Sequence, residues 1–244
     1  MGSGMFRSLQ HGASGATEAV SPLTVLLCLA ACFGACVGVA AQSAFGNPSV
    51  ALLAFGAAVS LAAFGLAQSY PHAVLGWCNT VTLARAAMVA FLSGAIFQTG
   101  ASAWIVFGMA SLAFALDGVD GWLARQSGLI STFGARFDME TDAALGAVLA
   151  LWLMASGTTG PEILALGFMR YAFLTAAWIW PQLQGELPEV FRRKAICVVQ
   201  IAVLIALVCP LTPAVLVAPL TIGGTLLLFW SFLVDILWLT RRAG

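Results

Sequence analysis

The chain has 244 residues, of which 61% are hydrophobic and only 8% are charged. An ordinary soluble domain has about 25% charged residues and needs them to cover its surface, so this composition excludes a water-soluble globule. The formal net charge is zero, which gives no sign of a nucleic-acid partner. We therefore predict the lipid bilayer, and no nucleic acid, as the surroundings of this protein.

Apolar runs follow one another along the chain, and the core of a bilayer takes about 20 apolar residues per helix. The runs predict an all-α fold, a polytopic membrane helical bundle with a cytoplasmic N-terminal tail at residues 1–21. The first run has no clear positively charged region before it, so we predict a retained helix and not a cleaved signal. The eight predicted spans are 22–41, 49–69, 80–98, 102–116, 143–158, 162–181, 195–211 and 214–239.

The basic residues indicate how the bundle is oriented. The short connections at 42–48, 98–101, 158–161 and 211–213 contain no Lys or Arg, and only Arg170 is predicted to lie inside a span. The other nine basic residues are on or near the side that both termini share, which the positive-inside rule makes cytoplasmic. We predict a multi-pass protein of the cell inner (cytoplasmic) membrane, with both termini in the cytoplasm.

Four aspartates lie between the fourth and fifth spans, in a chain with only ten acidic residues. Asp117 and Asp120 are spaced to share one face of a helix that continues from the fourth span, and Asp138 and Asp142 to share one face of the helix that enters the fifth. A loop around residues 127–133 would let these helices run antiparallel. The four carboxylates would then converge near the cytoplasmic membrane surface.

Clustered carboxylates repel one another and need a cation to stay ionised at a partly buried site. Oxygen ligands without His or Cys favour Mg²⁺ or Mn²⁺, and these cations also bind phosphate. Gly121, Ala124 and Gly134 would let a bulky ligand approach the backbone. Arg125 would supply a positive charge for a diphosphate. The residues therefore predict a metal and diphosphate site that faces the cytosol.

The aspartates belong to a longer pattern with eight fixed positions: Asp117-x2-Asp120-Gly121-x2-Ala124-Arg125-x8-Gly134-x3-Asp138-x3-Asp142. At every fixed position this pattern resembles the signature of the CDP-alcohol phosphotransferase (CDP-alcohol phosphatidyltransferase) family, a highly specific match. A looser likeness covers about residues 72–240, which look like that family's six-helix core. We therefore expect a catalytic membrane domain at 70–244, preceded by two additional transmembrane helices at 22–69.

An upstream element supports the same resemblance. Asn79, Thr82 and Arg85 resemble the family's Asn-x2-Thr-x2-Arg element, although Cys78 stands where proline is common.

The resemblance implies a phospholipid-synthesis enzyme that transfers a phosphatidyl group from CDP-diacylglycerol to a small polar alcohol and releases CMP. Asp117, Asp120 and Asp138 would hold the metal, Asp142 would share a second ion, and Asp142 would be the general base for the acceptor hydroxyl. A homodimer is also implied. The nucleotide and diphosphate would bind at Asn79, Thr82, Gly121, Ala124, Arg125 and Gly134, and the acceptor at Arg170, Arg192, Arg193 and Lys194.

Several alternatives stay open from the sequence. The donor could be a soluble CDP-alcohol with diacylglycerol as acceptor, or the acids could serve a cation-coupled membrane transporter. Glycerol 3-phosphate, inositol phosphate, serine and a choline-type alcohol are all possible acceptors. The basic run 192–194 could instead fix orientation or contact anionic lipid. Arg170 could pair with Asp235, although we expect Asp235 to extend to water at the end of the last helix.

Overall fold

The computed structural model describes residues 21–98, 100–185 and 191–243, and over these residues it contains helices and no strand. The predicted all-α bundle is confirmed. The predicted tail lies outside the described residues except for residue 21. The helices in chain order are α1 (Pro22–Phe45), α2 (Ser49–Ser69), α3 (Gly76–Ala95), α4 (Ala103–Ser127), α5 (Thr132–Ala155), α6 (Ile163–Ile179), the 3₁₀ turn η1 (Pro181–Gln184), α7 (Phe191–Val208) and α8 (Ala214–Ala243).

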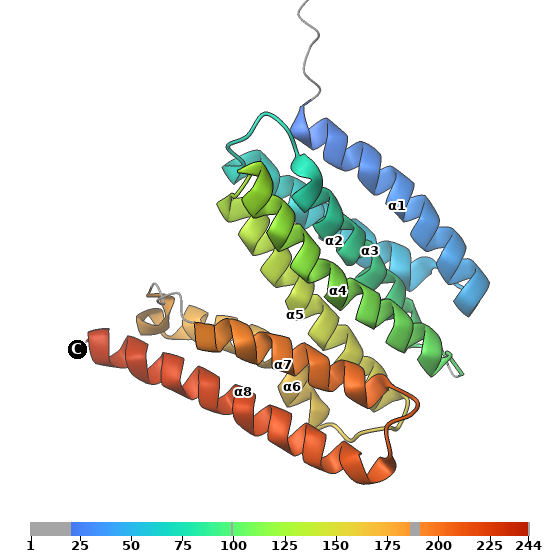
Figure 1. The fold of residues 1–244 in the computed structure, drawn as a ribbon, viewed down its shortest axis with the longest axis vertical. Helices are drawn as coiled ribbons and strands as arrows, with labels where there is room; N and C mark the ends of the chain where they lie inside the picture. The colour runs from blue at the N-terminus through green and yellow to red at the C-terminus, as the bar shows by residue number, and fades with distance from the viewer. Residues whose placement is uncertain (1–20, 99, 186–190, 244) are drawn as a thin grey trace, which may run out of the picture.

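The helices form two groups, α1 to α5 and α6 to α8 (Figure 1). Within the first group, α3 packs against α1, α2, α4 and α5, and α5 also packs against α6 and α7 of the second group. Successive helices alternate in direction, so the end of α2, the start of α3, the end of α4 and the start of α5 meet at one end of the bundle (Figure 1). The helix that is most enclosed by others is therefore α3, and Leu83 and Leu92 on it are fully buried.

In the described part of the chain, five helices are long and apolar enough to cross a membrane, namely α1, α2, α3, α4 and α8. These helices make the chain a multi-pass membrane protein. Of the other three predicted spans, α6 and the apolar part of α7 are shorter than the roughly 20 residues that a bilayer core requires. The third, α5, begins with the polar stretch that holds Asp138 and Asp142.

A tight connection turns the chain back between α4 and α5. Gly128 ends α4 with a φ of 68°, a left-handed conformation that glycine adopts without the strain of a side chain. Ser131 then begins α5, because its side-chain oxygen accepts a hydrogen bond from the backbone N–H of Gly134 at 3.0 Å. The antiparallel arrangement expected from the loop around 127–133 is present, and both helices pack on α3.

Candidate active site

The four aspartates converge on one guanidinium group, which belongs to Arg85 in α3. Nη2 of Arg85 lies 3.1 Å from an oxygen of Asp117, and Nη1 lies 2.8 Å from an oxygen of Asp120. The same two nitrogens form ion pairs with Asp142 and Asp138, respectively. Two carboxylates from α4 and two from α5 are thus held together by an arginine from the helix against which both pack.

Further hydrogen bonds fix the arginine and one of its partners. The side chain of Arg85 is 1% exposed, and its Nε donates to the carbonyl oxygen of Ala113 at 3.0 Å. The hydroxyl of Thr82 donates to Asp120 at 3.0 Å. A buried charge of this kind is stable only when it is paired and hydrogen-bonded, and Arg85 meets both conditions.

The prediction that Arg170 alone among the basic residues lies inside a span was wrong, because Arg85 lies inside the span predicted at 80–98 and inside α3. Arg85 matched the upstream family element, but it was not among the predicted site residues. An ionisable residue within an apolar helix marks a functional site by default, and this signal was available in the sequence.

Three of the aspartates are placed to share a cation. One carboxylate oxygen from each of Asp117, Asp120 and Asp138 lies within 4.8 Å of the others. A set of carboxylate oxygens suits a hard divalent cation, so the residues present fit the predicted Mg²⁺ or Mn²⁺. Asp138 precedes the predicted fifth span, and burial, followed by repulsion from Asp142, raises its pKa to about 7. A bound cation would favour the ionised form of this carboxyl.

Asn79 and Gly134 meet where α3 and α5 approach each other. Asn79 is 2% exposed, and its Nδ2 donates to the carbonyl oxygen of Leu75 at 2.6 Å and to the hydroxyl of Tyr70 at 3.2 Å. A Cβ atom at position 134 would lie 3.1 Å from Oδ1 of Asn79. Glycine at this position therefore permits the close approach of the two helices.

The remaining predicted diphosphate residues lie along the last turns of α4. Gly121 and Ala124 are partly exposed and Arg125 is exposed. Apart from its chain neighbours and the nearby backbone of its own helix, a Cβ atom at position 121 would meet one described atom, Nη1 of Arg125, at 3.5 Å. Small residues beside an exposed arginine leave room for a ligand next to Asp117 and Asp120.

Arg170, predicted at the acceptor site, pairs with Glu140 across α6 and α5 at 2.5 Å. It does not pair with Asp235, so that alternative was wrong. Nε of Arg170 is buried and has no hydrogen-bond partner among the described residues. An unsatisfied buried donor is costly, and a ligand could satisfy it.

Arg192 is bound to α8 by several interactions. It donates to the carbonyl oxygen and the hydroxyl of Ser231 at 3.0 and 2.7 Å, forms an ion pair with Asp235, and lies 5.5 Å from the ring centre of Trp230. Asp235 is 7% exposed, so the expectation that it extends to water was wrong. A carboxylate buried between α7 and α8 requires a cationic partner, which Arg192 provides.

The other two basic residues predicted at the acceptor site follow Arg192 in the chain. Lys194 is exposed, and the side chain of Arg193 lies outside the described residues.

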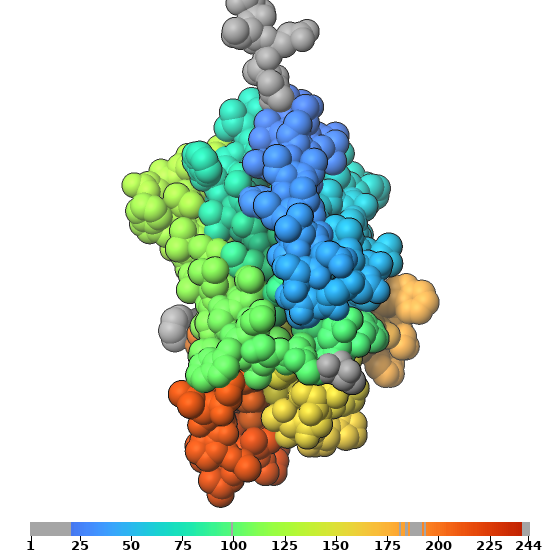
Figure 2. All heavy atoms as spheres, turned by 90° about the vertical axis from the view of Figure 1, so that its right-hand side faces the viewer, coloured from blue at the N-terminus to red at the C-terminus, as the bar shows by residue number. Residues whose placement is uncertain are grey.

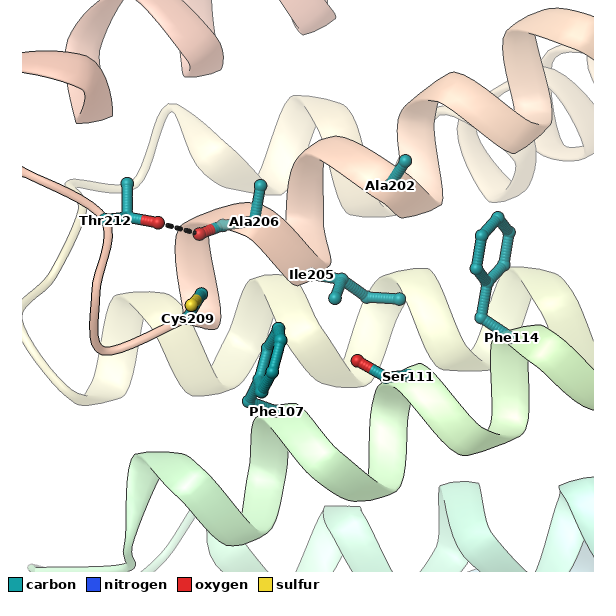
Figure 3. Close-up of a pocket in the computed structure, with 8 residues that line it drawn as sticks. All are labelled: Phe107, Ser111, Phe114, Ala202, Ile205, Ala206, Cys209 and Thr212. Carbon is teal, nitrogen blue, oxygen red and sulfur yellow. Dashed lines mark hydrogen bonds between the residues drawn. The ribbon is translucent and has the colours of Figure 1, made fainter.

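An apolar groove of about 380 Å³ lies between α4 and α7. Figure 3 shows Phe107, Ser111 and Phe114 on α4 opposite Ala202 and Ile205 on α7. Phe114 lies one helical turn before Asp117, so the groove extends along α4 toward the aspartates. Its lining residues are Phe107, Ser111, Phe114, Ala202, Ile205, Ala206, Cys209 and Thr212.

A family model described as CDP-alcohol phosphatidyltransferase matches residues 75–237, which is more than half of the chain. The match begins just before α3 and includes Arg85 and all four aspartates, whereas α1 and α2 lie outside it. No curated protein and no solved structure matches the chain significantly.

Proposed function

The chain belongs to the CDP-alcohol phosphatidyltransferase family, and from that premise we propose that it transfers a phosphatidyl group from CDP-diacylglycerol to a small polar alcohol and releases CMP. The observation that carries this proposal is the convergence of four carboxylates on Arg85, with three of them close enough to share one cation. The cluster lies in helices that cross or border the membrane, where a lipid donor and a polar acceptor can meet.

In the proposed reaction, Asp142 accepts the proton of the acceptor hydroxyl. The acceptor oxygen then forms a bond to the β-phosphorus of the donor. The bond from this phosphorus to the bridging oxygen breaks, and CMP leaves with the electron pair. Arg125 offers a positive charge to the phosphates, and Arg85 holds the carboxylates at fixed positions.

Asp117, Asp120 and Asp138 are the residues that would hold Mg²⁺ or Mn²⁺, with Asp142 sharing a second ion. When bound, such a cation supplies electrostatic stabilisation of the charge on the phosphates. The carboxylate-only donor set supports this assignment.

The donor would occupy the space between α3, α4 and α5. We assign the cytidine pocket to Asn79, Thr82, Gly121, Ala124 and Gly134. The hydroxyl of Thr82 already donates to Asp120, so this residue would act at the pocket partly by orienting that carboxylate. The apolar groove between α4 and α7 offers a lateral path for an acyl chain toward the aspartates.

A phosphorylated alcohol is the acceptor that the basic residues favour. Arg170 supports this choice with its unsatisfied Nε, and Lys194 does so with its exposed ammonium group. Arg192 is already engaged by α8, which favours a structural role over acceptor binding. Arg193 remains part of the proposal on sequence grounds alone.

We also propose that the protein lies in the inner (cytoplasmic) membrane as a homodimer, with both termini and the site facing the cytosol. Eight of the ten basic residues lie outside the predicted spans and on one side of them, which supports this orientation.

The experiment that tests the proposal measures CMP release by purified protein in lipid vesicles. CDP-diacylglycerol is offered with glycerol 3-phosphate, inositol phosphate, serine or choline, each with Mg²⁺ and with EDTA. We expect Mg²⁺-dependent CMP release with a phosphorylated acceptor. CMP formed only from a CDP-alcohol plus diacylglycerol would reverse the assigned donor, and cation flux without CMP would establish a transporter.

A further inference from the structure

The segment 70–75 connects α2 to α3, and we call it the strap. All of it except Leu75 lies outside the region matched by the family model. The proposed reaction uses none of its side chains, and it leaves α1 and α2 without a role. Tyr70 and His72 are nevertheless the residues through which the strap contacts the α4–α5 connection and the start of α3.

The hydroxyl of Tyr70 controls how Asn79 is oriented. It lies 2.7 Å from the carbonyl oxygen of Val74 and 2.8 Å from that of Leu75, and it accepts a hydrogen bond from Nδ2 of Asn79 at 3.2 Å. Nδ2 also donates to the Leu75 carbonyl. Both amide hydrogens are thus directed at the strap, which leaves Oδ1 of Asn79 facing Gly134.

The hydroxyl of Tyr70 keeps its proton at neutral pH and can therefore donate a hydrogen bond. Tyr70 lies between the membrane-spanning helices α2 and α3, and burial raises its pKa. The phenol therefore stays protonated at neutral pH.

The ring of Tyr70 fixes the start of α5. It packs edge-on against Phe133 with a centroid distance of 5.6 Å, and Phe133 stacks on Phe137 at 5.7 Å. His72 packs edge-on against Tyr70 at 5.3 Å, and its Nε2 donates to the carbonyl oxygen of Ile130 at 3.2 Å. The strap thus holds both the α4–α5 connection and the helix that presents two of the aspartates.

The two N-terminal helices hold the strap in place. α2 packs against α3 and α5, and α1 packs against α2 and α3. Figure 2 shows α1, in blue, on the outer face of the molecule, and this helix packs on α2 and α3. A Cβ atom on Gly65 of α2 would lie 3.3 Å from the ring of Phe133, so α2 itself reaches the aromatic cluster. The position of Tyr70 relative to α3 and α5 is therefore set by a packed helix pair.

We propose that Tyr70 is a positioning residue for the nucleotide pocket, and that α1 and α2 serve to anchor it. Tyr70 acts through Asn79, whose Oδ1 it leaves free as an acceptor for the donor groups of a cytidine nucleotide. The inference rests on the proposed function, because it presupposes that Asn79 borders a nucleotide.

The test uses Tyr70→Phe, which removes the hydroxyl and keeps the ring contacts with Phe133 and His72. Ser69→Ala is the matched control, because the hydroxyl of Ser69 bonds to the Gly65 carbonyl of its own helix at 3.0 Å. The full-length protein is assayed for the KM of CDP-diacylglycerol, for kcat, for the Kd of CMP and for the melting temperature.

We expect Tyr70→Phe to raise the KM of CDP-diacylglycerol and the Kd of CMP by about tenfold, the factor that corresponds to one hydrogen bond of about 1.4 kcal/mol. The kcat should match that of Ser69→Ala, and the melting temperature should fall by no more than about 2–4 °C, the shift that corresponds to one lost hydrogen bond. In an Asn79→Ala background, Tyr70→Phe should change the Kd of CMP no further, because its effect passes through that amide.

Two results would overturn the inference. One is a Kd of CMP for Tyr70→Phe equal to that of Ser69→Ala, and the other is an undiminished effect in the Asn79→Ala background. Both leave the proposed function intact, since the wild type still binds and releases CMP. A wild-type protein that neither binds nor releases CMP would instead refute the proposed function itself, and the positioning role with it.

Discussion

Replacing Arg85 by Gln removes the positive charge that all four aspartates share and leaves a shorter, neutral polar side chain. The four carboxylates would then face one another without the guanidinium that lies between them. We expect the variant to be unstable without divalent metal and to recover when a divalent cation is added.

The size of the loss follows from how deeply each partner is buried. The side chain of Asp120 is 5% exposed, so its pair with Arg85 belongs to the buried class, in which removal of one partner costs about 3–5 kcal/mol. The side chains of Asp117, Asp138 and Asp142 are 23–35% exposed, so water screens them and each pair adds at most about 1 kcal/mol. The pair with Asp120 therefore dominates, and a loss of this size lowers a melting temperature by about 10 °C.

Tryptophan fluorescence during thermal unfolding in detergent measures this effect, with EDTA or with Mn²⁺. Arg136→Gln is the matched control, because Arg136 is an exposed arginine on α5. Mn²⁺ should raise the melting temperature of Arg85→Gln more than that of wild type, since the cation replaces the missing charge and no guanidinium competes with it. Equal melting temperatures of Arg85→Gln and Arg136→Gln in EDTA would refute this reasoning, as would equal stabilisation of Arg85→Gln and wild type by Mn²⁺.

Three further substitutions test other parts of the site. Asp142→Asn should lower kcat for CMP release by about 10²–10⁴-fold while Asp117, Asp120 and Asp138 still bind the first cation, and near-normal turnover would contradict its role as the base. Gly134→Ala would place a methyl group 3.1 Å from Oδ1 of Asn79, so the KM of the donor should rise by about fivefold or more; an unchanged KM would place the donor elsewhere. Arg192→Met should cost about 2–3 kcal/mol in unfolding experiments, because it leaves Asp235 buried without its partner. Asp235→Asn in that background should recover part of the loss, and strictly additive effects would show that the two side chains are not coupled.

The helices could be predicted because a bilayer imposes a minimum apolar length. The span predicted at 49–69 coincides with α2. The span predicted at 80–98 begins too late, because α3 starts at Gly76 and includes the buried residues Cys78 and Asn79 before that span. These side chains face protein and not lipid, and a hydropathy pattern alone does not distinguish those surroundings.

The meeting of the four aspartates could be predicted from their spacing, since residues three or four apart share a helix face. The partner at their centre could not be found in this way, because Arg85 lies 35 residues before Asp120 in the chain. The pair of Arg192 and Asp235 is likewise 43 residues apart. Such long-range pairs depend on how the helices pack, and spacing along one helix carries no information about that packing.

The enclosure of α3 also bears on how the protein is made. Of its most apolar stretch, 72% is buried by protein, against 17% in α1 and 22% in α2. An arginine at the centre of a lone transmembrane helix opposes insertion by about 2.5–3.5 kcal/mol. During synthesis α1 and α2 emerge before α3 and can enter the bilayer on their own hydrophobicity. The arginine-bearing helix then leaves the translocon beside two helices that are already in the membrane and that offer it a protein surface.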